Sequence, residues 1–148
     1  MGRFDGKVVL VTGGCRNTGV AIVEKFRREG AKVYTCDIGV EPQPGVFACD
    51  ISDAAQVTAM FDAIAAESGR LDILVNNAAH QGIGKPFVEM DPAYVMEVLG
   101  VNVKGGFQVT QQAVNRFFRK QESRGVVVFL TSNTAMRAIR NRTAYCAS

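Results

Sequence analysis

The stretch with the clearest chemistry is the glycine-containing turn from Thr12 to Gly19, because its backbone can bind a phosphate. Gly13 and Gly14 allow a tight turn directly after an apolar run. Backbone N–H groups at the start of the next helix, together with the positive end of its dipole, would then point at an anion. The turn therefore predicts a nucleotide-binding site, and a purely structural strand-to-helix turn is the alternative that it leaves open.

The elements on either side of this turn have the patterns that such a site requires. The run Val8–Val11 is too short for a helix and rich in β-branched residues, so we expect a strand buried on both faces. In the segment Val20–Arg28, apolar residues recur at helical spacing and the other face is charged. We expect an amphipathic helix there, with four residues on its buried face: Val20, Ile22, Val23 and Phe26.

The rest of the chain continues this alternation, which predicts an α/β fold. Asp53 and Gln56 have capping-box spacing, so a second helix should begin there and bury its apolar residues. Asp91 followed by Pro92 starts a long helix that runs to about Gln121, and its three glycines indicate a bend or close packing. The further expected strands are Lys32–Asp37, Val46–Cys49, Leu71–Val75 and Gly125–Leu130.

The spacing of the phosphate turn resembles the T-G-x-x-x-G-x-G motif of the short-chain dehydrogenases/reductases, with Asn17 in place of one glycine. Asparagine tolerates a left-handed backbone better than most residues, so we expect the turn to survive. The segment Asn76–Ala79 resembles the N-N-A-G motif of the same family, with Ala79 replacing the glycine. Ser132, followed thirteen residues later by Tyr145, resembles the family's active site, whose motif is Y-x-x-x-K.

The resemblance covers the whole chain and implies a fold and an activity. The expected fold is one NAD(P)-binding domain over residues 1–148, a Rossmann-type doubly wound parallel sheet with strand order 3-2-1-4-5. The implied activity is interconversion of a secondary alcohol and a ketone by hydride transfer. In this family Tyr145 would move the proton, Ser132 would hydrogen-bond the carbonyl oxygen and Asn102 would order a relay water.

The same resemblance predicts the cofactor site, and its residues favour NAD over NADP. Asp37 ends the second strand, where a carboxylate accepts bonds from the adenosine ribose and repels a 2′-phosphate. Arg16 opposes this preference, because a basic residue in the turn can pair with a 2′-phosphate. Asp50 matches the family residue that bonds the adenine amino group. The expected cofactor-binding residues are Gly13, Cys15, Arg16, Asn17, Thr18, Gly19, Asp37, Ile38, Asp50, Ile51, Asn77 and Ala78.

The lysine of Y-x-x-x-K would be residue 149, one position after the last residue of the sequence. The phenol of tyrosine has a pKa of about 10, and a nearby cation is needed to lower it. The strand at Gly125–Leu130 would also be an uncovered apolar edge. We therefore expect an N-terminal fragment with little or no activity of its own, whose full-length form is a homo-oligomer.

Composition excludes several other classes of protein. The net charge of +3 is too small to predict a nucleic-acid or membrane partner, and the sequence has no secretory signal or membrane-spanning run, so we expect a cytoplasmic protein. The four cysteines lack metal-ligand spacing and no metal is expected; we expect small buried thiols, although Cys15 in the phosphate turn could be reactive. His80, the single histidine, is expected to be a loop residue.

The substrate cannot be identified from the sequence, and three alternatives to a general alcohol dehydrogenase stay open. Arg137, Arg140 and Arg142 could bind an anionic acyl carrier, which makes a 3-oxoacyl carrier-protein reductase the nearest alternative, although a solvated basic loop also explains them. A dinucleotide-binding module without catalysis is the second alternative. A non-functional gene fragment is the third.

Overall fold

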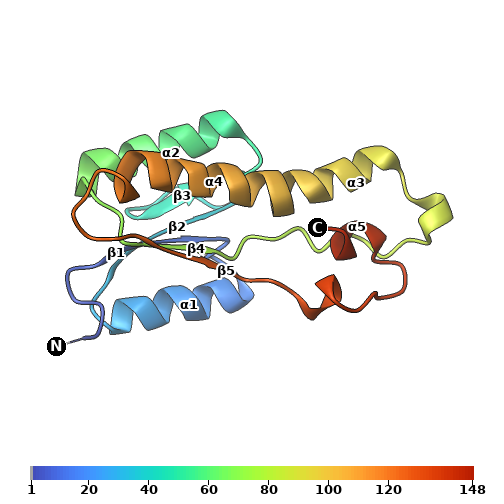
Figure 1. Ribbon diagram of the computed structural model, residues 1–148, viewed down its shortest axis with the longest axis horizontal. Coiled ribbons are helices and arrows are strands. Elements are labelled where there is room, and N and C mark those ends of the chain that lie inside the picture. The colour runs from blue at the N-terminus through green and yellow to red at the C-terminus, as the bar shows by residue number, and fades with distance from the viewer. Residues whose placement is uncertain (1) are drawn as a thin grey trace.

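Five parallel strands form the central sheet of the protein, whose computed structural model describes residues 2–148 (Figure 1). The sheet order is β3-β2-β1-β4-β5, and every pairing between these strands is parallel. This arrangement confirms the predicted Rossmann-type fold, and the strand ends differ from the predicted ones by one or two residues. The strands are β1 (Val8–Thr12), β2 (Lys32–Asp37), β3 (Val46–Ala48), β4 (Ile73–Asn76) and β5 (Val126–Phe129).

Helices cover both faces of the sheet, with α1 on one face and α2 and α4 on the other (Figure 1). The α-helices are α1 (Asn17–Arg28), α2 (Ala54–Ser68), α3 (Pro92–Leu99), α4 (Gly106–Ala113) and α5 (Thr143–Cys146). A π-helical segment, Gly100–Gly105, joins α3 to α4, and a second one, Val114–Phe118, follows α4. The predicted long helix is therefore one rod that ends near Phe118, and its expected distortion is the π-helical segment beside the glycines.

The side chains of β1 alternate between two hydrophobic clusters. Val8 and Leu10 pack with α2 and α4, whereas Val9 and Val11 pack on the α1 side with Val23. All five residues of β1 are buried. The prediction of a central strand buried on both faces is confirmed.

The buried face of α1 differs from the predicted one at its first turn. The helix begins at Asn17, so its inward stripe starts with Gly19 and continues through Ile22, Val23 and Phe26. Gly19 lies so close to the turn that a Cβ atom would be 2.0 Å from the carbonyl oxygen of Gly13. Val20 therefore falls on the flank of the helix and is 36% exposed, so its predicted burial was wrong.

The edge strand β5 is covered on one face only. Val127 packs against the cluster on the α2 and α4 side. Val126 and Val128 pair with Ile73 and Val75, whose side chains face α1, yet they are 51% and 41% exposed because α1 does not reach β5. The predicted exposed apolar edge is thus present on the α1 face of the sheet.

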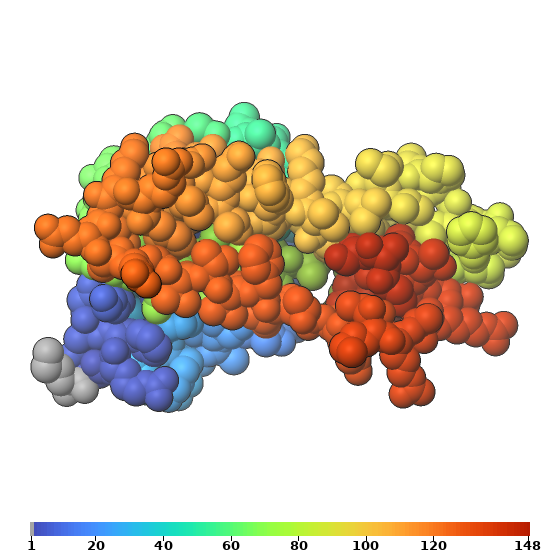
Figure 2. Space-filling view, viewed as in Figure 1, coloured from blue at the N-terminus to red at the C-terminus, as the bar shows by residue number. Residues whose placement is uncertain are grey.

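The chain after β5 leaves the sheet and folds beneath α3 (Figures 1 and 2). In the space-filling view, this C-terminal segment and the loop that precedes α3 form a lobe beyond the end of the sheet (Figure 2). Arg142 joins the two parts by donating to the carbonyl oxygens of Gln81 and Gly82. Within residues 2–148, no helix combines the length and the apolar character needed to cross a bilayer.

Candidate active site

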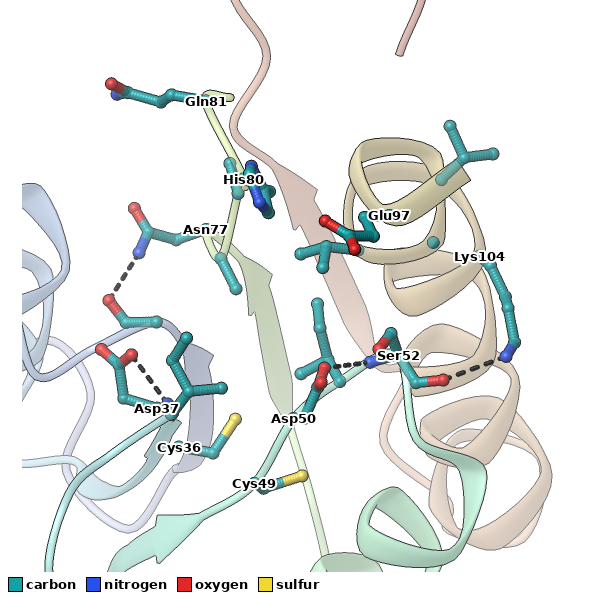
Figure 3. Close-up of a pocket in the computed structure, with 18 of the residues that line it drawn as sticks. Cys36, Asp37, Cys49, Asp50, Ser52, Asn77, His80, Gln81, Glu97 and Lys104 are labelled. Carbon is teal, nitrogen blue, oxygen red and sulfur yellow. Dashed lines mark hydrogen bonds between the residues drawn. The ribbon is translucent and has the colours of Figure 1, made fainter. Parts of the chain in front are cut away.

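A cavity of about 1550 Å³ opens at the carboxyl ends of the strands (Figure 3). Its walls are the turn after β1, the end of β2, the segment Asp50–Ser52 after β3, the segment Asn77–Gln81 after β4, and one side of α3 with the following π-helical segment. In open α/β sheets ligands bind at this edge, next to the point where the strand order reverses. The predicted phosphate turn therefore faces a space large enough for a ligand.

The phosphate turn has the backbone that the glycine pattern predicts. Gly13 has a φ of +64°, and a Cβ atom there would lie 2.8 Å from the Cα atom of Ala78. Asn17 has a φ of +46°, so asparagine takes the left-handed conformation that the family's glycine would take. The prediction that Asn17 preserves the turn is confirmed. Thr18 is exposed beside it and lines the cavity.

Side chains after β4 fasten the turn in place. The Asn77 side-chain amide donates to the carbonyl oxygens of Thr12 and Gly13, each at 2.9 Å. The Thr12 hydroxyl oxygen accepts from the backbone N–H groups of Asn77 and Ala78, each at 3.1 Å. These four hydrogen bonds join two segments far apart in the sequence, and they hold the mouth of the cavity in one shape.

Asp37 presents its carboxylate at the end of β2, where it is 9% exposed. It accepts hydrogen bonds from the backbone N–H groups of Cys15 at 3.3 Å and Ile38 at 2.9 Å. The Arg16 guanidinium donates to the same carboxylate at 2.5 Å and to the Ile38 carbonyl oxygen at 3.1 Å. The hydrogen bond to Asp37 raises the pKa of Arg16. The two residues that were expected to favour opposite cofactors are thus paired with each other.

The segment after β3 holds Asp50 and Ile51 at the cavity. The Asp50 carboxylate accepts from the backbone N–H of Ser52 at 2.8 Å. The Gln56 side-chain oxygen accepts from the N–H of Asp50, also at 2.8 Å, instead of closing a capping box with Asp53. Asp53 itself still caps α2, as predicted, by accepting from the first-turn N–H groups.

Cys15 lacks the features of a reactive thiol. Burial raises its pKa, and the charge of Asp37 acts in the same direction. A thiolate is the nucleophilic form of cysteine, so this environment disfavours reaction at Cys15. Cys36 and Cys49 are buried at the floor of the cavity, as expected for small core thiols, while Cys146 is only half-buried.

The three expected catalytic residues lie beyond the cavity and are not hydrogen-bonded to one another. Asn102, in the π-helical segment, accepts from the His80 N–H at 2.7 Å and donates to the His80 carbonyl at 3.1 Å and the Ser148 hydroxyl at 2.8 Å. Ser132 accepts from the N–H of Thr134 at 3.2 Å, which begins a short 3-10 turn. Tyr145 is half-buried in α5, beside a small space that Arg142 also borders.

Sequence reasoning missed several residues of this site. His80 lines the cavity, and its ring is fixed because Nδ1 accepts from the Gly82 N–H at 3.0 Å and the ring meets Tyr94 edge-on at 5.9 Å. Lys104 and Gln108 donate to backbone carbonyls of the segment Asp50–Ser52. The sequence held one signal for the latter two, which is their spacing of four residues in a glycine-rich helix.

Comparison with known proteins places this chain among the dehydrogenases. The family model for short chain dehydrogenases matches residues 7–148. D-threitol dehydrogenase of Mycolicibacterium smegmatis is 35% identical over 99% of this chain and 60% of its own length. Galactitol 2-dehydrogenase of Agrobacterium fabrum is 31% identical, again over 99% of this chain and 60% of the relative.

Solved structures agree with this placement. NAD⁺-bound xylitol dehydrogenase has a TM-score of 0.87 at 27% identity, covering 98% of this chain and 60% of that one. The 3-ketoacyl-(acyl-carrier-protein) reductase of Brucella melitensis, complexed with NADH, has a TM-score of 0.88 at 28% identity, covering 97% and 64%. The chain spans about three fifths of the length of these relatives. With its matched family model, its sheet order and its phosphate turn, the chain belongs to the short chain dehydrogenase family.

Proposed function

We propose that this protein is an NAD-dependent oxidoreductase that interconverts a secondary alcohol and a ketone. The observation that carries the proposal is the pairing of a close-packed phosphate turn with the carboxylate of Asp37 at one cavity. The turn suits a pyrophosphate, and the carboxylate suits the two hydroxyls of an adenosine ribose. NAD carries both of these groups.

The residues present fit this cofactor. A Cβ atom at Gly13 would clash with Ala78, and one at Gly19 would clash with the Gly13 carbonyl oxygen, so the two glycines keep the turn close-packed at the wall of the cavity. Asp37 would accept the ribose hydroxyls and disfavour a 2′-phosphate, and Asp50 would accept from the adenine amino group. Bound NAD supplies a nicotinamide ring that takes up a hydride.

The acid–base steps are assigned to the chain's own side chains. Tyr145 would hold the proton on its phenol oxygen and exchange it with the substrate oxygen. Ser132 would donate a hydrogen bond to that oxygen, and Asn102 would order the water through which the proton leaves. The two hydrogen bonds between the Asn102 side chain and the backbone of His80 support this role, because they fix the orientation of the Asn102 amide.

A small polyol is the substrate class that we favour, because relatives named for threitol, galactitol and xylitol recur among the matches. A 3-oxoacyl carrier-protein reductase is the second candidate, since MabA of Mycobacterium avium is 32% identical and Arg137 and Arg140 are exposed near the C-terminal lobe. Arg142 already donates to two carbonyl oxygens, which leaves the other two arginines for an acidic partner.

The same proposal includes a cytoplasmic, homo-oligomeric enzyme without nucleic-acid or membrane partners.

The experiment is a substrate survey with a matched pair of variants. The purified full-length form of the protein is mixed with NAD and a series of secondary alcohols and polyols, or with NADH and a 3-oxoacyl thioester, and absorbance at the NADH band is followed. Tyr145→Phe should abolish turnover and keep NAD affinity, whereas Tyr34→Phe, which loses a phenol bonded to Ser68 outside the cavity, should keep both. NAD binding without turnover on any substrate would instead identify a binding module.

A further inference from the structure

The segment Asp50–Ser52 at the cavity is held by two side chains of the long helical rod, and one of them, Lys104, also lines the cavity. Lys104 Nζ donates to the carbonyl oxygen of Ser52 at 3.0 Å (Figure 3), and the Gln108 side-chain amide donates to the carbonyl oxygen of Ile51. Residues four positions apart share one face of a helix, so both donors reach the same segment. Two consecutive carbonyls are therefore bonded to one helix.

The π-helical segment lets the rod pack directly against the segment Asp50–Ser52. Gly105 ends the π-helical turn, and a Cβ atom there would lie 2.8 Å from Cγ1 of Ile51 and 3.1 Å from its carbonyl oxygen. Ile51 itself is buried in the cluster between the sheet and the rod. The absence of a side chain at Gly105 is what allows Lys104 and Gln108 to come within hydrogen-bonding distance.

Three other polar backbone groups of this segment are bonded locally. The N–H of Asp50 donates to Gln56, and the N–H of Ser52 donates to the Asp50 carboxylate. The carbonyl oxygen of Asp50 accepts from the N–H of Asp53 at 3.0 Å. The carbonyls of Ile51 and Ser52 are the groups that the rod supplies with donors. Losing either donor would free this part of the cavity wall to move.

We propose that Lys104 and Gln108 are positioning residues that hold the segment Asp50–Ser52 in the conformation that recognises the adenine end of the dinucleotide. The inference rests on the proposed function, because it takes NAD as the ligand. Both residues act through the backbone: Lys104, which is exposed and lines the cavity, acts through the Ser52 carbonyl, and Gln108 acts through the Ile51 carbonyl.

Calorimetric titration of NAD and of AMP tests the proposal with four variants. Lys104→Met and Gln108→Leu should each lower the affinity for AMP and the affinity for NAD by the same factor, roughly three- to tenfold, because each variant loses one hydrogen bond to the segment Asp50–Ser52. Lys104→Arg should keep the affinity of the unmodified protein. Lys120→Met removes an equal charge just beyond the end of the rod and should change the affinity for neither ligand, which controls for net charge. Because Gln108 is uncharged, a loss of affinity in Gln108→Leu separates positioning from attraction of the phosphates.

Hydrogen exchange supplies the readout that does not depend on ligand. In Lys104→Met and Gln108→Leu, the amides of Ser52 and Asp53 should exchange faster than in the unmodified protein, while amides in the middle of α2 keep their rates. Unchanged exchange and unchanged AMP affinity in both variants would overturn the inference. Failure of the unmodified protein to bind NAD would overturn the proposed function instead, so the two failures are distinct.

Discussion

Arg16 and Asp37 form an ion pair at the rim of the cavity, with Nη2 of the arginine 2.5 Å from Oδ1 of the carboxylate. The arginine side chain is 58% exposed, whereas the aspartate is nearly buried. The carboxylate is also held by two backbone N–H groups, so it stays in place if the arginine moves. Asp37 is thus the fixed partner of the pair, and the choice between NAD and NADP should depend mainly on it.

Replacing Asp37 with serine should reverse the cofactor preference. The variant loses the acceptor for the ribose hydroxyls and the charge that repels a 2′-phosphate, and it releases Arg16 to bind that phosphate. NAD affinity should fall by roughly tenfold and NADP affinity should rise, as measured by calorimetry. Asp62→Ser removes the aspartate of another arginine pair, outside the cavity, and is the control. An unchanged NAD to NADP ratio in Asp37→Ser would contradict the assignment of this carboxylate.

Asn17 should be replaceable by glycine but not by alanine. Its φ of +46° costs an ordinary L-residue about 1–2 kcal/mol, and asparagine and glycine tolerate it better. Asn17→Ala should therefore lower the free energy of unfolding by about 1 kcal/mol, while Asn17→Gly should leave it nearly unchanged. Denaturant titration of the three proteins measures this difference. Equal stability of the alanine and glycine variants would show that the turn is not left-handed at this residue.

Asp72 should make stability depend on acid pH. Its side chain is 4% exposed and accepts from the Val8 N–H at 2.9 Å and from Arg70 at 3.0 and 2.5 Å. Burial by itself would raise the pKa of Asp72. The hydrogen bonds from Arg70 and Val8 and the positive charges of Arg70 and Lys7 together outweigh the effect of burial, so the pKa of Asp72 is lowered. Its contribution to stability is complete above the unfolded pKa of about 3.9 and is lost as pH falls through the lower folded value.

The matched variant for this prediction is Asp72→Asn. At pH 7 it should lower the free energy of unfolding by roughly 1–3 kcal/mol, because a buried acceptor of charged hydrogen bonds is weakened. Below the folded pKa the difference from the unmodified protein should shrink, since Asp72 is then protonated in both states of that protein. Thermal unfolding followed from pH 7 to about pH 2, which extends well below the unfolded pKa, measures both effects. A difference that stays constant over this range would contradict them.

Local spacing predicted the parts of the site that depend on neighbours in the sequence. The phosphate turn, Asp37 at the end of β2 and the cap at Asp53 were all expected, because each depends on a few consecutive residues. The contacts of Lys104 and Gln108 were not, because their spacing shows only that they share a helix face, and the carbonyls that they bond lie 52 and 57 positions away in the sequence. Val20 was misplaced because shifting the start of α1 rotates its whole buried stripe.

The expected catalytic residues illustrate the other limit. Asn102 could be located in the long helix, yet its bonds to His80 bring together residues 22 positions apart, which no local pattern specifies. Ser132 and Tyr145 are recognisable by their spacing alone. Their joint action on a substrate oxygen stays a prediction.

Transfer of deuterium from a substrate carbon to the cofactor tests the central claim most directly. The purified full-length form of the protein is incubated with NAD and a polyol that carries deuterium on every one of its secondary alcohol carbons, and the resulting NADH is analysed by mass spectrometry. We predict one deuterium on the nicotinamide ring, and none when Tyr145→Phe is used. NADH without deuterium, or equal transfer by the Tyr145→Phe variant, would contradict hydride transfer with Tyr145 as the acid–base group.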